Sequence, residues 1–307
     1  MTRKSLLAVL IIGIGLIAAP LYFRMFSRAP LGGQMIEQFQ PFMNSRTTSN
    51  LDGHLKLIDR SHGELSQIPA ASDLPQSSAF IRKWPEINTQ MTEMLVVIER
   101  NFDNFAAVDA LPPFPLFPWF FVLPGVILAG VAFIGLRRVA TRRDAGRLIS
   151  IIALLGLGLI AAPGVSKMFH RAPLGAQMID DFRPLMTEGR VQSVQQYFLV
   201  IASAEAEVRN QVKPGSGIPI TDWANDFPSL AQFERQWPAI ASDMAPVVGA
   251  MSDNLRNFAA VDALPPFWLF PWFFVLPGLM VVVLAGTAFR ARDVSVVPRE
   301  LSVLEEA

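Results

Sequence analysis

The sequence predicts an all-α membrane protein with four transmembrane helices in two tandem repeats, each a membrane span, an external helical bundle and a second span. Three observations predict this fold class. Four long apolar runs carry no charged residue. The segment 105–125 recurs at 258–278 with one difference, Pro115 against Trp268. Between the runs, apolar residues recur at helical spacing without the alternation of a strand.

The bulk composition excludes several classes of protein. Of 307 residues, 51% are hydrophobic and 17% are charged, which is too apolar for most soluble folds. The 26 basic and 26 acidic residues cancel, so the chain has no polyelectrolyte surface for nucleic acid. Cysteine is absent, which excludes disulfides, thiolate metal sites and thiol nucleophiles.

Each apolar run is close to the roughly 20 residues that cross about 30 Å of hydrocarbon. The predicted spans are 5–23, 116–136, 148–166 and 269–289. The first could be a signal peptide, but its counterpart is internal, so we expect an uncleaved anchor. Small residues four apart would let the spans pack closely; they are Gly15 with Ala19, Gly158 with Ala162, and Gly125 with Ala129.

Basic residues predict the direction of the spans. The connector between the second and third spans is rich in arginine and the N-terminus is basic, so the positive-inside rule places both termini in the cytoplasm and both long loops outside. Four further basic residues flank the external ends and weaken this bias without reversing it. The connector carries Arg137, Arg138, Arg142, Arg143 and Arg147, the N-terminus carries Arg3 and Lys4, and the flanking residues are Arg24, Arg28, Lys167 and Arg171.

The arginine-rich connector and the alanine- and proline-rich helices together resemble bacterial multi-pass membrane proteins. The resemblance is one of composition, and it implies neither a function nor a site. With the charge pattern, it leads us to expect a plasma membrane, specifically a bacterial inner membrane.

The repeats set the expected domain boundaries. Repeat 1 is expected over 1–143, with an external domain at 24–115, and repeat 2 over 144–292, with an external domain at 167–268. A cytoplasmic tail would follow at 293–307. Each repeat has an even number of spans, so the copies share one orientation and a parallel pseudo-two-fold axis is expected to relate them.

Equivalent positions of the two copies differ by 143 residues before the central loop of each external domain, as for Gly13 and Gly156. They differ by 153 after it, as for Phe105 and Phe258, so the second copy has ten extra residues (153 less 143). We expect the insertion in Lys213–Pro219, because its prolines and glycines are typical of turns.

Prolines and apolar stripes predict the helices of the external domains. Pro30 and Pro173 are expected to kink or stop the helix that leaves the lipid. The longest external helix is expected to begin near Trp84–Pro85 and near Trp237–Pro238, because proline suits a first helical turn. Each domain would be a bundle of about three helices, and two such bundles side by side could share one core.

Two groups of residues are candidates for a structural role at the membrane boundary. Aromatic residues are expected to anchor the returning spans at the interface, or alternatively to form a lipid-facing or partner-facing groove; they are Phe117, Trp119, Phe120, Trp268, Trp272 and Phe273. Arg28 is predicted to pair with Asp109, and Arg171 with Asp262, which would tie together the two stalks of each external domain. The alternative use of the two aspartates as a general-acid pair is weaker.

No motif in the sequence points to catalysis. His54 and His62 lie eight residues apart without a further defined ligand, and His170 lies at a membrane boundary, so none predicts a metal site. Phosphate-binding glycine loops, GxSxG and HExxH motifs are absent. The predicted spans contain no Asp, Glu, Lys, Arg or His, which argues against ion transport. We therefore expect no catalytic residue, cofactor or metal.

These observations favour a non-enzymatic membrane protein that acts as an accessory or scaffold subunit of a membrane or envelope complex, with membrane lipid and another membrane protein as partners. The alternative is a protein that handles or transports lipid or small apolar molecules. Four residues of the apolar stripe on the longest external helices distinguish the two functions. An open cavity lined by Met91, Leu95, Met244 and Val248 would favour handling, and solid packing of these residues would favour the scaffold.

Overall fold

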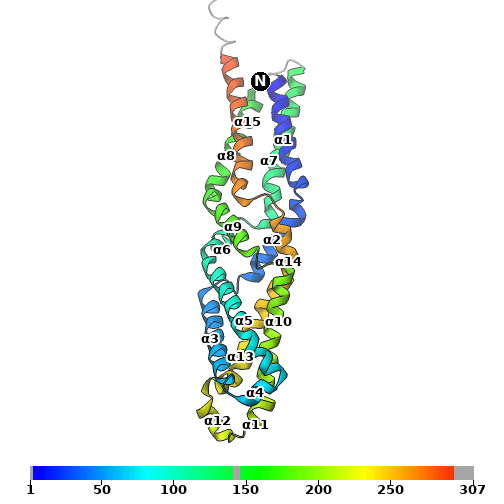
Figure 1. Ribbon diagram of the computed structural model, residues 1–307. Coiled ribbons are helices and arrows are strands. Elements are labelled where there is room, and N and C mark those ends of the chain that lie inside the picture. The colour runs from blue at the N-terminus through cyan, green and yellow to red at the C-terminus, as the bar shows by residue number, and fades with distance from the viewer. Residues whose placement is uncertain (1–2, 141–145, 294–307) are drawn as a thin grey trace, which may run out of the picture. The chain divides into compact units, whose positions relative to one another are not determined.

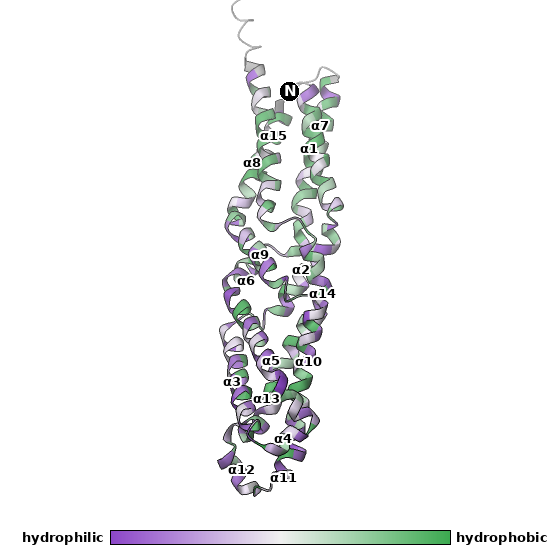
Figure 2. Ribbon diagram, viewed as in Figure 1, coloured by the Kyte–Doolittle hydropathy of each residue, from purple (hydrophilic) through white to green (hydrophobic). Residues whose placement is uncertain are grey.

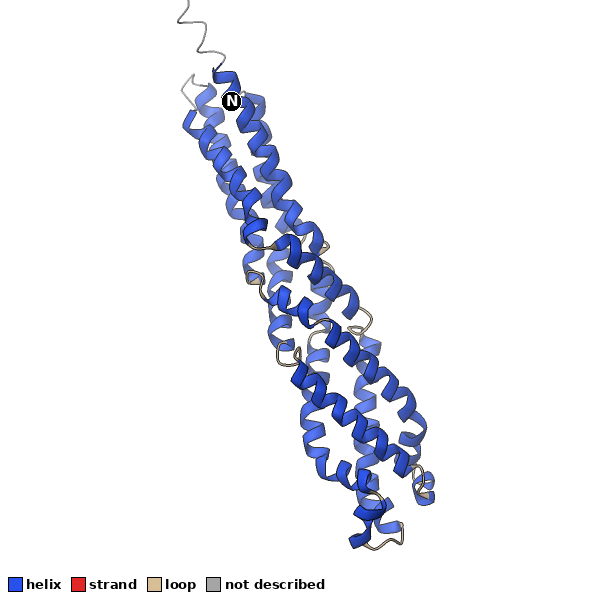
Figure 3. Ribbon diagram, turned by 90° about the vertical axis from the view of Figure 1, so that its left-hand side faces the viewer, coloured by secondary structure: helices blue, strands red, loops and turns tan. Residues whose placement is uncertain are grey.

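The computed structural model describes residues 3–140 and 146–293, and within these ranges every regular element is a helix (Figure 3). Contacts divide the chain into two compact units. We call Met1–Gly33, Ala107–Ala176 and Ala260–Ala307 the span unit, and Gln34–Ala106 and Gln177–Ala259 the bundle unit. Each unit draws on both the first half of the chain, 1–143, and the second half, 144–307.

The span unit contains four long apolar helices, α1 (Arg3–Tyr22), α7 (Phe117–Ala140), α8 (Gly146–Val165) and α15 (Phe270–Asp293) (Figure 1). They are the most uniformly hydrophobic helices of the chain in Figure 2. Four segments are long and apolar enough to cross a membrane, namely Arg3–Tyr22, Phe114–Val139, Arg147–Val165 and Phe267–Arg290. The prediction of an all-helical fold with four such helices is confirmed, and their bounds lie close to those expected.

The span helices pack in pairs, α1 against α7 and α8 against α15. At each crossing two glycines meet: a Cβ atom on Gly13 would lie 2.8 Å from the carbonyl oxygen of Gly125, and one on Gly278 would lie 2.8 Å from that of Gly156. Gly15 and Gly158, expected at these contacts, have open space at their Cβ positions. The expected pair Gly125 and Ala129 of α7 does lie at the crossing, whereas on α1 and α8 the contact is made by Gly13 and Gly156 on a neighbouring face of the helix.

The first span helix of each half ends at a basic residue in the left-handed conformation. Arg24 has φ 53° and Lys167 has φ 54°, a region that glycine favours. The next helices, α2 (Met25–Phe39) and α9 (Met168–Phe182), begin directly after them and continue through Pro30 and Pro173. The helices do not stop at these prolines, because the break lies six residues earlier in each half, and a kink at the prolines stays a prediction.

The bundle unit is built on α3 (Ser45–Leu65), α5 (Pro75–Arg100), α10 (Glu188–Glu207) and α13 (Pro228–Asp253). α3 and α10 each pack against both α5 and α13, which closes a four-helix ring. The ring has one hydrophobic core to which both halves contribute, including Ile58, Trp84, Ile201 and Ile240. The two halves thus form one bundle rather than two bundles of about three helices.

The shorter elements connect and extend this ring. They are α4 (Pro69–Asp73), α6 (Phe102–Asp109), the 3₁₀ turns η1 (Phe114–Leu116) and η3 (Phe267–Leu269), the π-helix η2 (Val208–Val212), α11 (Lys213–Gly215), α12 (Ile220–Asp226) and α14 (Leu255–Asp262). The stretch Lys213–Pro219 forms the turn between α10 and α12, with Gly217 at φ 74°. The repeat and domain limits stay predictions, and Arg142, Arg143 and 294–307 lie outside the described residues.

The longest bundle helices begin nine or ten residues earlier than expected, at Pro75 and Pro228 instead of Trp84 and Trp237. A glutamate from the other half of the chain caps each start. Glu207 accepts a hydrogen bond from the Ser77 backbone N–H at 2.6 Å, and Glu64 accepts from those of Ser229 and Leu230 at 2.9 and 2.8 Å. These carboxylates satisfy N–H groups that a helix start otherwise leaves unpaired.

Candidate functional site

Aromatic residues of the two returning segments meet inside the span unit. Ring centroids lie 6.3 Å apart for Phe114 and Phe267, 6.0 Å for Phe117 and Phe270, and 4.4 Å for Phe121 and Phe274. In each pair the two residues are 153 positions apart, so each ring touches its own counterpart in the other half. We call these six residues the aromatic ladder. Phe117, expected as an interfacial anchor, is buried in this ladder.

The remaining expected anchors are more exposed than Phe117. Trp119, Trp268 and Trp272 are 46%, 51% and 44% exposed, Phe120 is also exposed, and Phe273 is half-buried. Trp119 packs edge to face on Phe26 with centroids 5.5 Å apart, and Trp272 packs likewise on Phe169 at 5.7 Å. Exposed tryptophans on apolar helices suit a membrane interface, and their anchoring role stays a prediction.

Arg28 and Arg171 link the two halves through backbone carbonyls. An Nη1 of Arg28 donates to the Ala263 carbonyl at 2.8 Å, and that of Arg171 donates to the Ala110 carbonyl at 2.6 Å. Each guanidinium therefore reaches the residue after the aspartate of the other half. The predicted pairs Arg28 with Asp109 and Arg171 with Asp262 stay untested predictions, and the observed bonds show that both arginines cross between halves.

Polar residues at the helix breaks of the bundle unit make a second crossed set. Buried Asn101 donates to the carboxylate of Asp181 at 3.0 Å, and buried Asn254 donates to the side-chain carbonyl of Gln38 at 2.6 Å. Arg100 also binds Asp181, at 2.9 Å. Because Gln38 and Asp181 are equivalent positions, and so are Asn101 and Asn254, the same contact occurs twice with the halves exchanged.

A third crossed set lies along the middle of the bundle. The Nε2 atom of His54 lies 2.9 Å from the Asp243 carboxylate. At the equivalent positions the Tyr197 hydroxyl donates to Gln90 at 2.7 Å, and Gln90 also accepts from Arg190. His54 is therefore part of an interhelical link. Within the described residues no group of three or more metal-ligating side chains lies together.

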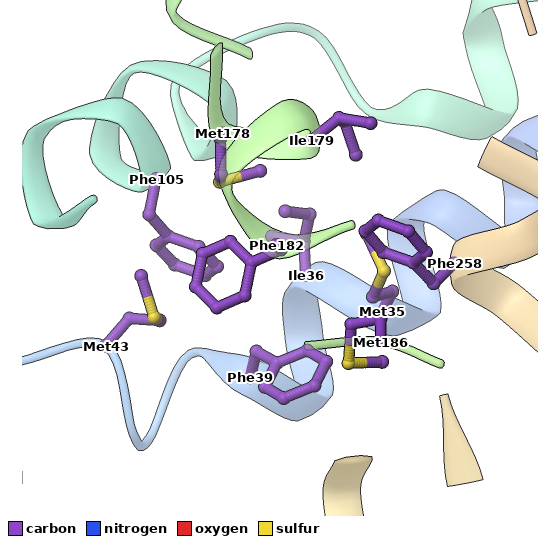
Figure 4. Close-up of a pocket in the computed structure, with 10 residues that line it drawn as sticks. All are labelled: Met35, Ile36, Phe39, Met43, Phe105, Met178, Ile179, Phe182, Met186 and Phe258. Atoms are coloured by element: carbon purple, nitrogen blue, oxygen red, sulfur yellow. The ribbon is translucent and has the colours of Figure 1, made fainter. Parts of the chain in front are cut away.

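Two apolar cavities lie in the bundle unit, and the first is lined by five pairs of equivalent residues (Figure 4). The lining residues are Met35, Ile36, Phe39, Met43, Phe105, Met178, Ile179, Phe182, Met186 and Phe258. The cavity has a volume of about 30 Å³ and exposes no polar surface. It therefore lacks any group that could orient a polar ligand or transfer a proton.

The second cavity lies inside the four-helix ring, and all four stripe residues expected to distinguish the function line it: Met91, Leu95, Met244 and Val248. Its volume is also about 30 Å³. A dry apolar cavity that binds benzene measures about 150 Å³, so neither space is large enough for a lipid chain as it stands. These four residues therefore line a cavity, but a small one.

Charged residues of α10, α13 and the connection between them form a group around buried Glu205 that sequence reasoning missed. Glu205, 1% exposed, lies 3.4 Å from Arg209, and the Lys213 ammonium donates to Glu234 at 2.9 Å. One oxygen of each carboxylate and the indole N–H of buried Trp223 have no hydrogen-bond partner among the described residues. Burial raises the pKa of Glu205 above its usual value; Arg209 lowers it, and the charge of Glu234 raises it further. We call these five residues the acid cluster.

Comparison of the chain with protein-family models and with curated proteins found no match. The described residues of the two units contain crossed links between halves, small apolar cavities and the acid cluster.

Proposed function

We propose that the chain is a non-enzymatic integral protein of a bacterial plasma membrane that serves as an accessory or scaffold subunit of a membrane or envelope complex. The observation that carries this proposal is how little free space the interior of the bundle unit holds. Its stripe residues leave only about 30 Å³ of space, and its polar side chains link helices of the two halves. A bundle with so little internal space and with its helices linked to one another is suited to bind a partner protein through its outer surface.

The chain is a fused pair of tandem repeats related by a parallel pseudo-two-fold axis. Crossed contacts that occur twice, at equivalent positions, support this arrangement. A two-fold axis requires that if residue i contacts j, the counterpart of i contacts the counterpart of j. Arg28 with Ala263 and Arg171 with Ala110 satisfy this condition, and the capping glutamates Glu64 and Glu207 do so in the other unit.

Both termini are cytoplasmic and the bundle unit is external, as the arginine-rich connector indicates. Because the chain has no cysteine, single cysteine variants test this directly. A membrane-impermeant maleimide added to intact cells is expected to label Ser66→Cys on the bundle unit. Arg142→Cys in the connector is expected to react only after permeabilisation. The reverse pattern of labelling would overturn the orientation.

The scaffold role is tested by purifying the tagged full chain from its native membrane in mild detergent and quantifying what remains bound. We expect a membrane-protein partner at about one copy per chain. Leu199, on α10, is 61% exposed, which makes it a candidate contact on the bundle surface. Leu199→Glu is then expected to release the partner. Lys56→Glu, at the equivalent position of the first half, is the matched control and should retain it.

Recovery of the chain without a stoichiometric protein would overturn the scaffold role. The second candidate is the handling of lipid or small apolar molecules, which the methionine-rich lining of both cavities favours. Methionine side chains are adaptable and can repack around an apolar guest. A defined lipid bound to the purified chain, and lost in the cavity-narrowing variant Ile179→Phe, would support this candidate. Solid packing of the cavities with no bound lipid would reject it.

A further inference from the structure

The chain twice holds a long basic residue in a backbone conformation that favours glycine. Arg24 and Lys167, which occupy equivalent positions of the two halves, are both left-handed. At the remaining left-handed position among the described residues the chain has a glycine, Gly217. The conformation destabilises any other residue because its Cβ atom crowds the backbone, and strain of this kind gathers at functional positions. Its repeated use with a cation therefore points to a role for the side chain.

Neither of these two cations has a partner within the described part of the chain. Both side chains are exposed, and no hydrogen bond or ion pair joins either of them to another described residue. Arg28 and Arg171, four residues further along, donate instead to backbone carbonyls of the other half. Each half thus uses one cation to hold the protein together and leaves the other free for an anion outside the chain.

The charges at this end of the span unit do not cancel. At the span ends opposite the arginine-rich connector, four side chains are basic and two are acidic, which leaves a net charge of +2 with histidine neutral (4 less 2). These ends comprise residues 19–33, 107–118, 162–176 and 260–271. The acids are Asp109 and Asp262. The excess equals the charge of Arg24 and Lys167, so two anionic groups would neutralise it.

Each cation is followed, two residues later, by a phenylalanine of an exposed aromatic pair. Phe26 packs on Trp119 and Phe169 packs on Trp272, and the four rings are between 37% and 46% exposed. Aromatic rings with a polar edge suit the depth at which lipid headgroups meet acyl chains. A long cation that follows an apolar helix by two residues reaches the same depth. The cation and its aromatic pair therefore match the two parts of one lipid.

We propose that Arg24 and Lys167, each with its aromatic pair, form two equivalent sites for an anionic membrane phospholipid such as phosphatidylglycerol. The cation donates charged hydrogen bonds to the phosphate oxygens, which are stronger than neutral ones. A zwitterionic lipid brings its own cation and would leave the excess charge in place. Free phosphate would engage the cation alone, whereas the rings fit a molecule that also carries an acyl chain. The inference rests on the proposed membrane location but not on the scaffold role.

Native mass spectrometry of the purified full chain in a neutral detergent, with added phosphatidylglycerol, tests the two sites. The double variant Arg24→Gln with Lys167→Gln is expected to carry two fewer lipids per chain than the wild type, and each single variant one fewer. Binding at each altered site should weaken by about tenfold or more, the loss expected for a hydrogen bond to a charged group. The difference from the wild type is the readout, because the arginine-rich connector also attracts anionic lipid.

A matched control removes the same charge elsewhere. Lys83→Gln with Arg235→Gln replaces one lysine and one arginine that are exposed and unpartnered among the described residues, on α5 and α13, and should retain every lipid. Arg24→Lys with Lys167→Arg keeps both charges and should retain them too. In thermal unfolding of the wild type, phosphatidylglycerol should raise the Tm, whereas phosphatidylcholine and inorganic phosphate at equal concentration should not.

A second double variant keeps the test decisive if glutamine disturbs the break between the helices. Arg24→Gly with Lys167→Gly relieves the strained backbone, so the Tm without lipid should rise while the gain from phosphatidylglycerol shrinks. The sites are overturned if both double variants keep the wild-type lipid count, if the matched control loses as many lipids, or if inorganic phosphate raises the Tm as phosphatidylglycerol does. A chain that stays soluble without detergent would refute the membrane location itself.

Discussion

Phe121 and Phe274 stack face to face, with ring centroids 4.4 Å apart and planes inclined by 27°. They are equivalent positions, so each ring packs on its own counterpart. A residue that contacts its counterpart lies at the axis that relates two copies, and the two other pairs of the aromatic ladder meet in the same way. If the proposed pseudo-two-fold axis exists, it must pass between these two rings.

A double-mutant cycle tests the contact between these two rings. Phe121→Leu, Phe274→Leu and the double variant are expected to show a coupling energy of about 0.5–1.5 kcal/mol, the usual value of an aromatic pair beyond its buried area. Stability is measured by reversible unfolding in detergent. The same cycle with Trp119→Leu, an exposed residue that packs on Phe26 instead, should be additive. Coupling absent from the first cycle would contradict the stacked geometry.

Sequence reasoning located the spans because their signal is local. A run of about 20 apolar residues is sufficient evidence for such a helix, whatever surrounds it. The start of α5 was missed because its cap, Glu207, lies 130 residues further along the chain than Ser77. The break at Arg24 was missed because a left-handed arginine has no signature of its own, whereas Pro30 has a strong one.

The candidate sites were harder to predict than the spans. An apolar stripe indicates which face of a helix is buried but not which helix covers it, so the exchange of partners between halves was not visible. Arg28 and Arg171 donate to the carbonyls of Ala263 and Ala110 in the other half, and these backbone contacts have no sequence signature. The acid cluster was missed because its members are spread from Glu205 to Glu234 and meet only after the turn folds back.

The glycine contacts in the span unit predict that alanine substitutions at neighbouring positions differ strongly in their effect on stability. Gly13→Ala is expected to destabilise the chain by about 1–3 kcal/mol, because the added methyl group would overlap the backbone of α7. Gly15→Ala, on the open face of the same helix, should be neutral or slightly stabilising. Thermal unfolding of both variants in the same detergent measures the difference. Equal effects would show that α1 and α7 do not approach at Gly13.

The left-handed basic residues predict a stabilising substitution. The left-handed conformation costs a non-glycine residue roughly 1–2 kcal/mol, whereas glycine pays about 0.5–1 kcal/mol in backbone entropy. Arg24→Gly and Lys167→Gly should therefore each stabilise the chain by about 0.5–1 kcal/mol. Ser27→Gly, inside α2, is the control and should destabilise it by about the same amount. Loss of stability in Arg24→Gly would mean that the contacts of the Arg24 side chain stabilise the fold by more than its left-handed backbone conformation destabilises it.

The crossed glutamate caps predict that substitution of a capping glutamate in one half destabilises the start of a helix in the other half. Glu207→Gln should weaken the start of α5, and Glu64→Gln that of α13, each by about 1–2 kcal/mol, because a charged acceptor is lost from a helix N-terminus. Hydrogen exchange locates the effect: protection should fall around Ser77 in the first variant and around Leu230 in the second. Glu188→Gln, an exposed acid at the start of α10, should alter neither region. Loss of protection confined to the mutated helix would contradict the exchange of caps, because each cap acts on a helix from the opposite half of the chain.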